Sequence, residues 1–467
     1  MDRTAPRNLQ GPNLGSLPVE ILLEICAQLC TECQIAGVEI GGPLATAGER
    51  QEIRHRGSAL ASLARASKTL HDIATPHLYH FLCHQPQDQA QRLPPLIRTL
   101  VLRPDLANHV RRIEVDHSNS PYPLSDEFVD LFAGAAAQQN MNLLPGWSGK
   151  ADRAALVLLE LLLVHATNIR ALHLFIGKRT TLSDLLLISD SQANTRHLSA
   201  PTSLTACARP HPNDAQPYFN LRPILLLIHY IPRLNSLYLH RGTATYTTLA
   251  EAFTRKSSGL AFLTSLAFDE CSVRPIYVAF FIRAINRLEV LKCTFHGLCF
   301  ESTDPDLDPS VIVEYLRLHK TTLREFTLFS DPGRVMRPRR DLKSLKDFSK
   351  LETVVTELEM LRGSNREEDE ASISLPEWLP QSLKRLELVH MGWTQRELQQ
   401  LWDLHAAVLR GEFKELRELV VEGSSDAKMT GAEQVALGVA WQEIEGFRYS
   451  LRETTRETRR EGNEWDD

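Results

Sequence analysis

Apolar and polar positions from about residue 105 onward repeat a short pattern. The pattern is apolar-x-x-apolar-x-apolar, whose last positions alternate as in a strand with one buried face. From Leu234 onward its copies begin 25 to 35 residues apart. The copies read VRRIEV from Val110, IRALHL from Ile169, LNSLYL from Leu234, LTSLAF from Leu263, LEVLKC from Leu288, LREFTL from Leu323, LETVVT from Leu351, LKRLEL from Leu383 and LRELVV from Leu416.

A second apolar cluster, with helical character, precedes most copies. Examples are FNLRPILLLIHYIP, IYVAFFIRAINR and SVIVEYLRLHKTT. One strand and one helix per unit is the layout of a leucine-rich repeat, in which strands stack into a parallel sheet and helices cover the outside. The uneven spacing and the missing Asn after each alternation make these repeats divergent, and only LTSLAFDEC, with Cys271, keeps the Asn/Cys position. The alternative is an ordinary α/β domain with leucine-rich strands.

The chain begins its first helix within LPVEILLEICAQL, from Leu17 to Leu29. Pro18 suits the first helical position because its missing N–H costs nothing there. Glu20 lies in the first turn, where the helix dipole favours a carboxylate. An apolar stripe follows one face of this helix: Leu17, Ile21, Leu22, Ile25 and Leu29.

A Gly-rich segment, Thr31 to Gly57, separates this helix from the next helical stretch, and we expect it to form a loop. Helical periodicity returns at Ser58 in SALASLARASKTLHDIATPHLYHFL. Two short helices are predicted there, and Pro76 is expected to break or restart the second. Their apolar stripe comprises Leu60, Leu63, Leu70, Ile73, Leu78 and Leu82.

Composition restricts the classes of function. With 467 residues the chain can bury a large core, and a net charge of −6 does not suit a general nucleic-acid binder. Eight scattered cysteines predict a reduced compartment, and the N-terminus has no apolar h-region. The most apolar runs, from Ala154 and Leu221, are too short for membrane spans. We therefore expect no nucleic-acid and no membrane partner, and a cytoplasmic or nuclear location.

Two groups of metal-ligating residues occur near the N-terminus. Their members are Cys26, Cys30 and Cys33 in the first group, and His71, His77, His80 and His84 with Cys83 in the second. The cysteines lack a fourth ligand in sequence and the histidines lack the Glu of a metalloprotease motif, so helix packing is the preferred interpretation. Phosphate-binding glycine loops and the GxSxG elbow are also missing from the sequence. We expect no metal site, no cofactor and no catalytic residue.

The N-terminal motifs together resemble the F-box. LPVEILLEICAQL, followed by LASLARASKTLHDIATPHLYHFL, reproduces its Leu-Pro start, its apolar helix and its leucine-rich second half in the right order. The match covers about a seventh of the chain, and the long insert between its halves departs from the family pattern. The resemblance implies docking on the Skp-family adaptor of a cullin–RING ubiquitin ligase. The adaptor contacts that it implies are Leu17, Pro18, Ile21, Leu22, Ile25, Leu60, Leu63 and Ser67.

F-box proteins joined to leucine-rich repeats resemble substrate receptors of SCF-type ligases. The repeats then bind a target protein, and ubiquitin chemistry occurs on other subunits. The expected target surface is the set of x positions on the repeat strands: Glu114, Asp116, His173, Phe175, Tyr238, His240, Asp269, Lys292, Arg385 and Glu387. The alternatives are a repeat scaffold without a ligase role, whose N-terminal helices form only a cap, and an unrecognised enzyme.

The predicted fold class is α/β, a small helical module followed by a leucine-rich-repeat-like solenoid. The expected organisation is a disordered N-terminus at 1–14, an F-box-like module at 15–84 with an inserted loop at 31–57, a linker helix at 85–104, a divergent repeat array at 105–445 and a charged tail at 446–467.

Overall fold

In the computed structural model the chain forms two compact units. The first comprises Met1–Asp116 and Pro121–His173, and the second comprises His117–Ser120 and Leu174–Asp467. The division falls well beyond residue 105, where the repeat array was expected to begin. The residues that the structure describes are 14–35, 47–83, 86–117, 124–139, 141, 143, 146–149, 151–176, 201–208, 218–229, 231–244, 258–295, 310–330, 344–362, 374–391, 394–424 and 431–454.

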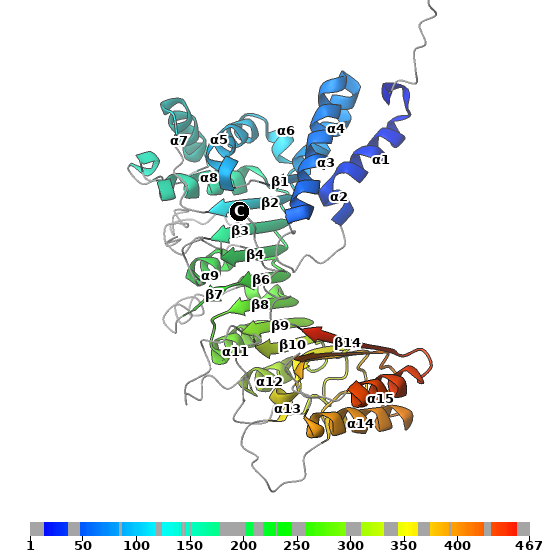
Figure 1. Ribbon diagram of the computed structural model, residues 1–467. Helices are drawn as coiled ribbons and strands as arrows, with labels where there is room; N and C mark the ends of the chain where they lie inside the picture. Colours follow the sequence, from blue (N-terminus) through cyan, green and yellow to red (C-terminus); the bar gives the residue numbers. More distant parts are fainter. Residues whose placement is uncertain are drawn as a thin grey trace, which may run out of the picture. The chain divides into compact units, whose positions relative to one another are not determined.

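An N-terminal helical module opens the first unit (Figure 1). After a short 3-10 turn at Leu14–Ser16, its helices are α1 (Val19–Leu29), α2 (Thr31–Ile35), α3 (Ala47–Ala66) and α4 (Lys68–His80). Pro18 is the N-cap of α1 rather than its first helical residue, and the Ser67 side chain caps α4 by accepting a hydrogen bond from the Leu70 N–H. One buried cluster holds α1, α3 and α4 together: Leu22, Cys26, Cys30, Leu60, Leu70, Ile73 and Ala74.

The predicted loop between Thr31 and Gly57 was wrong at both of its ends. Residues 31–35 form α2, and α3 begins at Ala47 rather than Ser58. Residues 36–46 lie outside the described part of the chain, as does almost all of the N-terminus that was expected to be disordered. Pro76 does not break the second helix, because α4 continues through it to His80. Burial of the α4 face that carries Leu70 and Ile73 offsets the hydrogen bond that proline cannot donate.

The rest of the first unit joins helices to the first parallel strands. Strand β1 pairs in parallel with β2, with Phe81 opposite Arg112. Helix α5 occupies the segment for which a linker helix was predicted, and the apolar run from Ala154 lies in α8. The remaining elements are β1 (Phe81–Cys83), α5 (Pro86–Leu102), α6 (Pro104–Ala107), β2 (Arg112–His117), α7 (Asp126–Gln138), η2 (Trp147–Gly149), α8 (Ala151–His165) and the start of β3 (Ala171–Ile176).

A parallel sheet organises the second unit, with strand order β4-β6-β8-β9-β10-β11-β12-β13-β14. Its strands are β4 (Ser203–Ala208), β6 (Ser236–His240), β8 (Ser265–Cys271), β9 (Val290–Phe295), β10 (Glu325–Ser330), β11 (Thr353–Glu357), β12 (Arg385–Met391), β13 (Glu418–Ser424) and β14 (Arg448–Thr454). A small second sheet pairs β5 (Phe219–Asn220) with β7 (Gly242–Thr243).

Helices alternate with most strands of the second unit, and α9, α11 and α12 follow one another along one side of the strands (Figure 1). Those described are α9 (Arg222–His229), α11 (Pro275–Ala284), α12 (Ser310–Leu316), α13 (Leu358–Arg362), α14 (Gln395–Leu409) and α15 (Gly431–Gln442). Short 3-10 turns are η5 (Ser258–Phe262), η7 (Arg317–His319) and η8 (Leu375–Glu377). Among the described residues, no helix combines the length and apolar character needed to cross a membrane.

Each predicted repeat copy contains a strand, so the α/β class with a large parallel sheet is confirmed. Strands outside the predicted copies were missed: the short β1, β5 and β7, and also β4 and β14 of the large sheet. Strand β4 keeps Leu204 but carries Ala206 at the position that aligns with Leu239 of β6, so its copy of the pattern is incomplete. Strand β14 lies in the segment predicted as a charged tail, where Tyr449 and Leu451 are its only large apolar residues. It continues the sheet by pairing with β13 over Glu418–Ser424.

Candidate functional site

Helix α1 carries exposed apolar side chains in its N-terminal half. Val19 and Leu23 lie one helical turn apart within α1 and are 48% and 45% exposed. Ile21 is 49% exposed, and Leu17, just before the N-cap Pro18, is 39% exposed. These four residues are the α1 apolar surface. Leu22, which lies between Ile21 and Leu23 in the sequence, is 2% exposed and belongs to the core of the module. The module therefore completes its own core and still leaves aliphatic surface in water.

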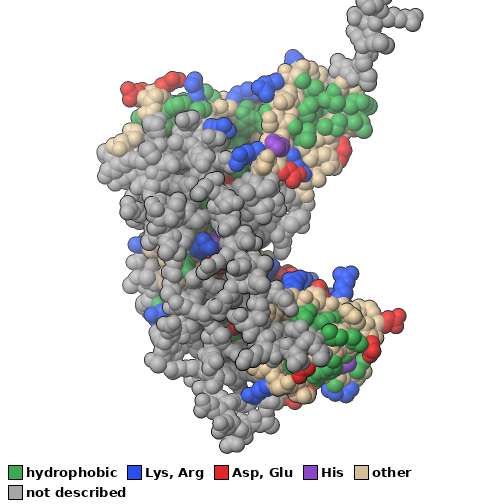
Figure 2. All heavy atoms as spheres, in the orientation of Figure 1, with side chains coloured by type: hydrophobic (Ala, Val, Ile, Leu, Met, Phe, Trp, Pro, Cys, Tyr) green, Lys and Arg blue, Asp and Glu red, His purple; other side chains and the backbone are tan. Residues whose placement is uncertain are grey.

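The same region stands out in the space-filling view. Hydrophobic side chains gather over α1 and α4 on the face drawn in Figure 2. Contiguous exposed apolar surface of this kind marks interaction sites, because water disfavours it in an isolated chain.

The expected adaptor contacts separate into two groups. Leu17, Pro18, Ile21 and Ser67 are exposed, and Ile25 is half-buried. Leu22 and Leu60 were wrongly assigned to the docking surface, because both are buried in the core cluster that joins α1 to α3. Leu63 packs against the same cluster. Ser67 is exposed, but its hydroxyl oxygen already accepts the α4 capping hydrogen bond.

In the second unit, side chains of alternate strand positions form continuous rows across the sheet. The pairing aligns Tyr238 with Ala267, Ala267 with Lys292 and, farther along, Val355 with Glu387. A neighbouring row on the same face aligns Val290 with Glu325. We call the face that carries these rows the strand face.

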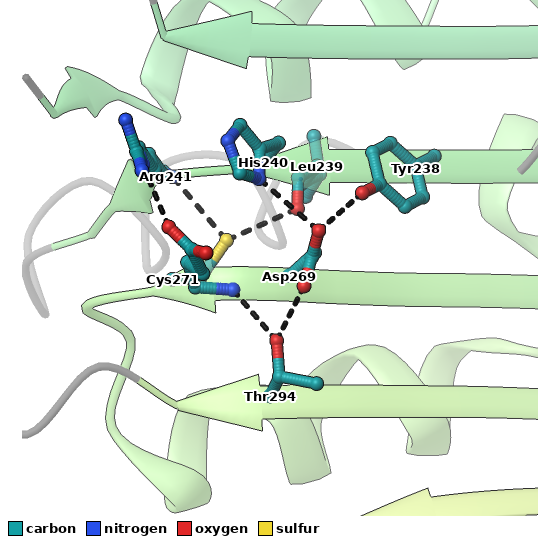
Figure 3. Close-up of polar contacts among 9 residues, drawn as sticks. Tyr238, Leu239, His240, Arg241, Asp269, Cys271 and Thr294 are labelled. Atoms are coloured by element: carbon teal, nitrogen blue, oxygen red, sulfur yellow. Dashed lines mark hydrogen bonds and ion pairs between the residues drawn. The ribbon is translucent and has the colours of Figure 1, made fainter. Parts of the chain in front are cut away.

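A polar network on the strand face centres on Asp269 of β8 (Figure 3). Tyr238 donates its hydroxyl hydrogen to one carboxylate oxygen, and His240 Nδ1 lies 3.1 Å from the same atom. Thr294 donates to the other oxygen at 2.6 Å, and its own oxygen accepts from the Glu270 N–H at 2.7 Å. Asp269 thus links three neighbouring strands, β6, β8 and β9.

Hydrogen bonding controls the ionisation of Asp269. Burial acts to raise the pKa of this carboxyl, but the bond and charge of His240, with the bonds from Thr294 and Tyr238, outweigh it and lower the pKa to about 2. Asp269 is therefore a carboxylate at neutral pH. Burial is the main cause that raises the pKa of Tyr238, so its phenol keeps its proton.

Farther along the sheet the strand face is more open and carries paired charges. Lys292 Nζ lies 3.5 Å from Glu325 Oε2, and these side chains are 49% and 42% exposed. Arg385 lies 2.7 Å from Glu387 on its own strand and 3.5 Å from Glu418 on β13. This part of the face presents both signs of charge to water.

The residues of the expected target surface differ in exposure. Lys292 is exposed, and Arg385, Asp269 and Glu387 keep partial exposure. The prediction of exposure was wrong for five residues, which are buried: Glu114, His173, Phe175, Tyr238 and His240. After their first residue, every residue of strands β3 and β6 is buried, as is common in parallel sheets. In β9, by contrast, buried residues alternate with more exposed ones. The side chain of Asp116 lies outside the described residues.

The structure also joins residues that sequence reasoning treated separately. Cys30, Cys33, His77 and His80 converge, with one ligand atom of each residue within 4.8 Å of the others. We call this set the Cys/His cluster. The spacings Cys-x2-Cys and His-x2-His are a sequence signal for a metal site. The prediction missed it because each spacing lies in a different group of residues, and neither group alone supplies four ligands.

The chain matches no protein-family model, and no curated protein matches it either. The sites are therefore interpreted from their own chemistry.

Proposed function

We propose that this chain is a substrate-recognition subunit of an SCF-type cullin–RING ubiquitin ligase. In this proposal the N-terminal helical module binds a Skp-family adaptor, and through it a cullin, while the strand face of the second unit binds a target protein. Ubiquitin transfer takes place on other subunits, so the chain needs no catalytic residue. Such a protein works in the cytoplasm or the nucleus.

The observation that carries the proposal is the exposure of the α1 apolar surface. Leu17 and Ile21 are 39% and 49% exposed although the module already has a closed core. A helix that served only as a cap for the repeats would pack these side chains. Burying them against a partner helix groove gains roughly 1.5–3 kcal/mol for each fully buried aliphatic side chain. This supports docking in preference to the capped-scaffold alternative.

The strand face supports target binding through its mixed chemistry. Its exposed part offers Lys292, Glu325 and Arg385 on three different strands, each with an oppositely charged neighbour. Paired charges at a protein surface contribute little stability but select partners through complementary potentials. The face therefore suits a polar or charged segment of a target protein.

The test is co-purification of the full chain with the Skp-family adaptor. The wild type is compared with the double substitution Leu17→Ala, Ile21→Ala. A matched control, Val435→Ala with Val439→Ala, removes an exposed i,i+4 aliphatic pair from α15, where the residues are 65% and 50% exposed. We expect the α1 variant to lose roughly tenfold or more in adaptor affinity and the α15 variant to bind like the wild type.

A folded wild type that does not capture the adaptor would contradict the ligase role and leave a repeat scaffold. Equal binding by the α1 variant and the wild type would show that the α1 apolar surface is not the docking site. Circular dichroism of each variant establishes that it is folded before its binding is interpreted.

A further inference from the structure

The Cys/His cluster joins two ends of the N-terminal module. Cys30 follows α1 directly and Cys33 lies in α2, whereas His77 and His80 lie in the last turn of α4. Cys30 and His80 are buried, and Cys33 and His77 are half-buried. Four side chains with metal-binding atoms thus meet at one partly enclosed point, at the opposite end of α1 from Leu17.

The distances within the cluster fit a tetrahedral metal. Cys30 Sγ lies 3.6 Å from His80 Nδ1, and Cys33 Sγ lies 3.6 Å from His77 Nδ1 and 3.4 Å from His80 Nδ1. Zinc bonds of about 2.3 Å to sulfur and 2.0–2.1 Å to nitrogen, set at tetrahedral angles, place sulfur and nitrogen ligands about 3.5 Å apart. These three distances fit a Cys2His2 ligand set, and all four ligand atoms lie within 4.8 Å of one another.

Hydrogen bonds can account for the two thiols, because Cys30 Sγ lies 3.6 Å from the His77 carbonyl oxygen and Cys33 Sγ can then donate to His80 Nδ1. Both thiols approach the same atom, Nδ1 of His80. A neutral imidazole nitrogen has one lone pair and can accept well from only one donor. A cation at the centre, by contrast, satisfies all four ligand atoms at once.

The charges of the four side chains suit a divalent cation. Two cysteine thiolates and two neutral imidazoles would make a zinc centre electrically neutral.

We propose that Cys30, Cys33, His77 and His80 bind a structural zinc ion. All four positions are filled by protein ligands, which is typical of structural rather than catalytic zinc. The ion closes a long loop, because 44 positions separate Cys33 from His77 in the sequence. It would fix the start of the inserted segment to the end of α4 and so stabilise a module interrupted by a long insert.

The test uses the full chain, purified in reductant without chelator. Elemental analysis should find about one zinc per chain, and X-ray absorption should show two sulfur ligands at about 2.3 Å and two nitrogen ligands at about 2.0–2.1 Å. A purified chain that holds no zinc even after incubation with zinc chloride would overturn the proposal. So would a coordination shell of oxygen atoms only.

A matched pair of variants assigns the ligands. Cys33→Ser with His77→Ala removes the two half-buried ligands and should weaken zinc binding by more than tenfold, since even the loss of partners that only orient ligands costs about 10–100-fold. Cys83→Ser with His71→Ala removes one cysteine and one histidine of the same region that are outside the cluster, and it should keep wild-type zinc content. Equal zinc content in both variants would refute the assignment. If the first variant does not fold, the absorption spectrum of the wild type decides the question.

Discussion

Arg112 and His173 form a buried polar contact between neighbouring strands of the first unit. Arg112 Nη2 lies 3.0 Å from His173 Nε2, and both residues are buried. Because a guanidinium can only donate, His173 must be neutral and accept through Nε2. Arg112 Nη1 also lies 3.8 Å from Glu32 Oε2 of α2. One buried arginine thus connects the N-terminal helical module to the first strands.

Acidification should destabilise the protein through His173. Burial, with the charge of Arg112, lowers the pKa of His173 from 6.5 to about 3. Between these values the unfolded chain binds a proton that the folded chain does not, so stability falls as the pH drops from about 6.5 toward 3. His173→Gln keeps an acceptor for Arg112 without titrating, and its urea unfolding should depend less on pH.

The exposed His71 provides the control for this measurement. His71→Gln should keep the pH dependence of the wild type. An unfolding free energy that varies with pH identically in His173→Gln and the wild type would contradict the assignment to His173.

Removing the charge of Glu32 should destabilise the first unit. The Glu32 and Arg112 side chains are only 14% and 6% exposed. Glu32→Gln leaves a buried guanidinium without this carboxylate, and breaking a buried pair in this way costs about 3 kcal/mol. Adding Arg112→Met removes the buried guanidinium that has lost this carboxylate and should recover much of the loss. Denaturant unfolding of both variants tests this, and a double variant no more stable than Glu32→Gln would show that the pair does not interact.

Neighbouring residues of α1 should respond differently to truncation. Leu22→Ala opens a cavity in the core cluster and should lower the free energy of unfolding by about 2–5 kcal/mol. Ile21→Ala removes a side chain that is 49% exposed and should change it by about 0.5 kcal/mol. Urea unfolding compares them directly. Equal losses would mean that the division of α1 into buried and exposed faces is wrong.

The Asp269 network should stabilise the second unit only where its carboxylate is ionised. The pKa of Asp269 is lowered from 3.8 to about 2, so its contribution is fully present above about pH 4 and is lost as the pH falls through 2. Asp269→Asn should cost about 2 kcal/mol at pH 6, and the difference from the wild type should shrink on acidification. The control is Asp347→Asn, which changes an exposed aspartate. If the loss of unfolding free energy in Asp269→Asn did not depend on pH, the ionised carboxylate of Asp269 would not be its cause.

Local patterns predicted most of the fold. The alternation in copies such as LEVLKC and LREFTL appears as strands β9 and β10, because a strand with one buried face needs no information beyond its own side chains. Helix α1 likewise forms where apolar periodicity and Glu20 indicated, although it begins at Val19, one residue after the predicted start at Pro18. Strand β14 escaped prediction because its place in the sheet depends on pairing with β13 more than on its own apolar residues.

Exposure along the strand face could not be predicted from alternation. Tyr238 and Lys292 occupy equivalent x positions, yet Tyr238 is 4% exposed and Lys292 lies in water. Alternation tells which side of a strand a residue occupies, whereas coverage of that side depends on other parts of the chain. For the same reason Leu22 and Ile21, adjacent in one apolar helix, have opposite roles.

The sequence by itself determined the α/β class, the repeated strands and the apolar first helix, because periodicity is a local property of neighbouring side chains. Only the tertiary structure decided which of these side chains remain in water and which distant groups meet. Cys33 and His77 are 44 positions apart, yet their ligand atoms lie 3.6 Å from each other. Packing of α1 and α3 against α4 brings these two residues together. No local sequence pattern predicts that they are close in space.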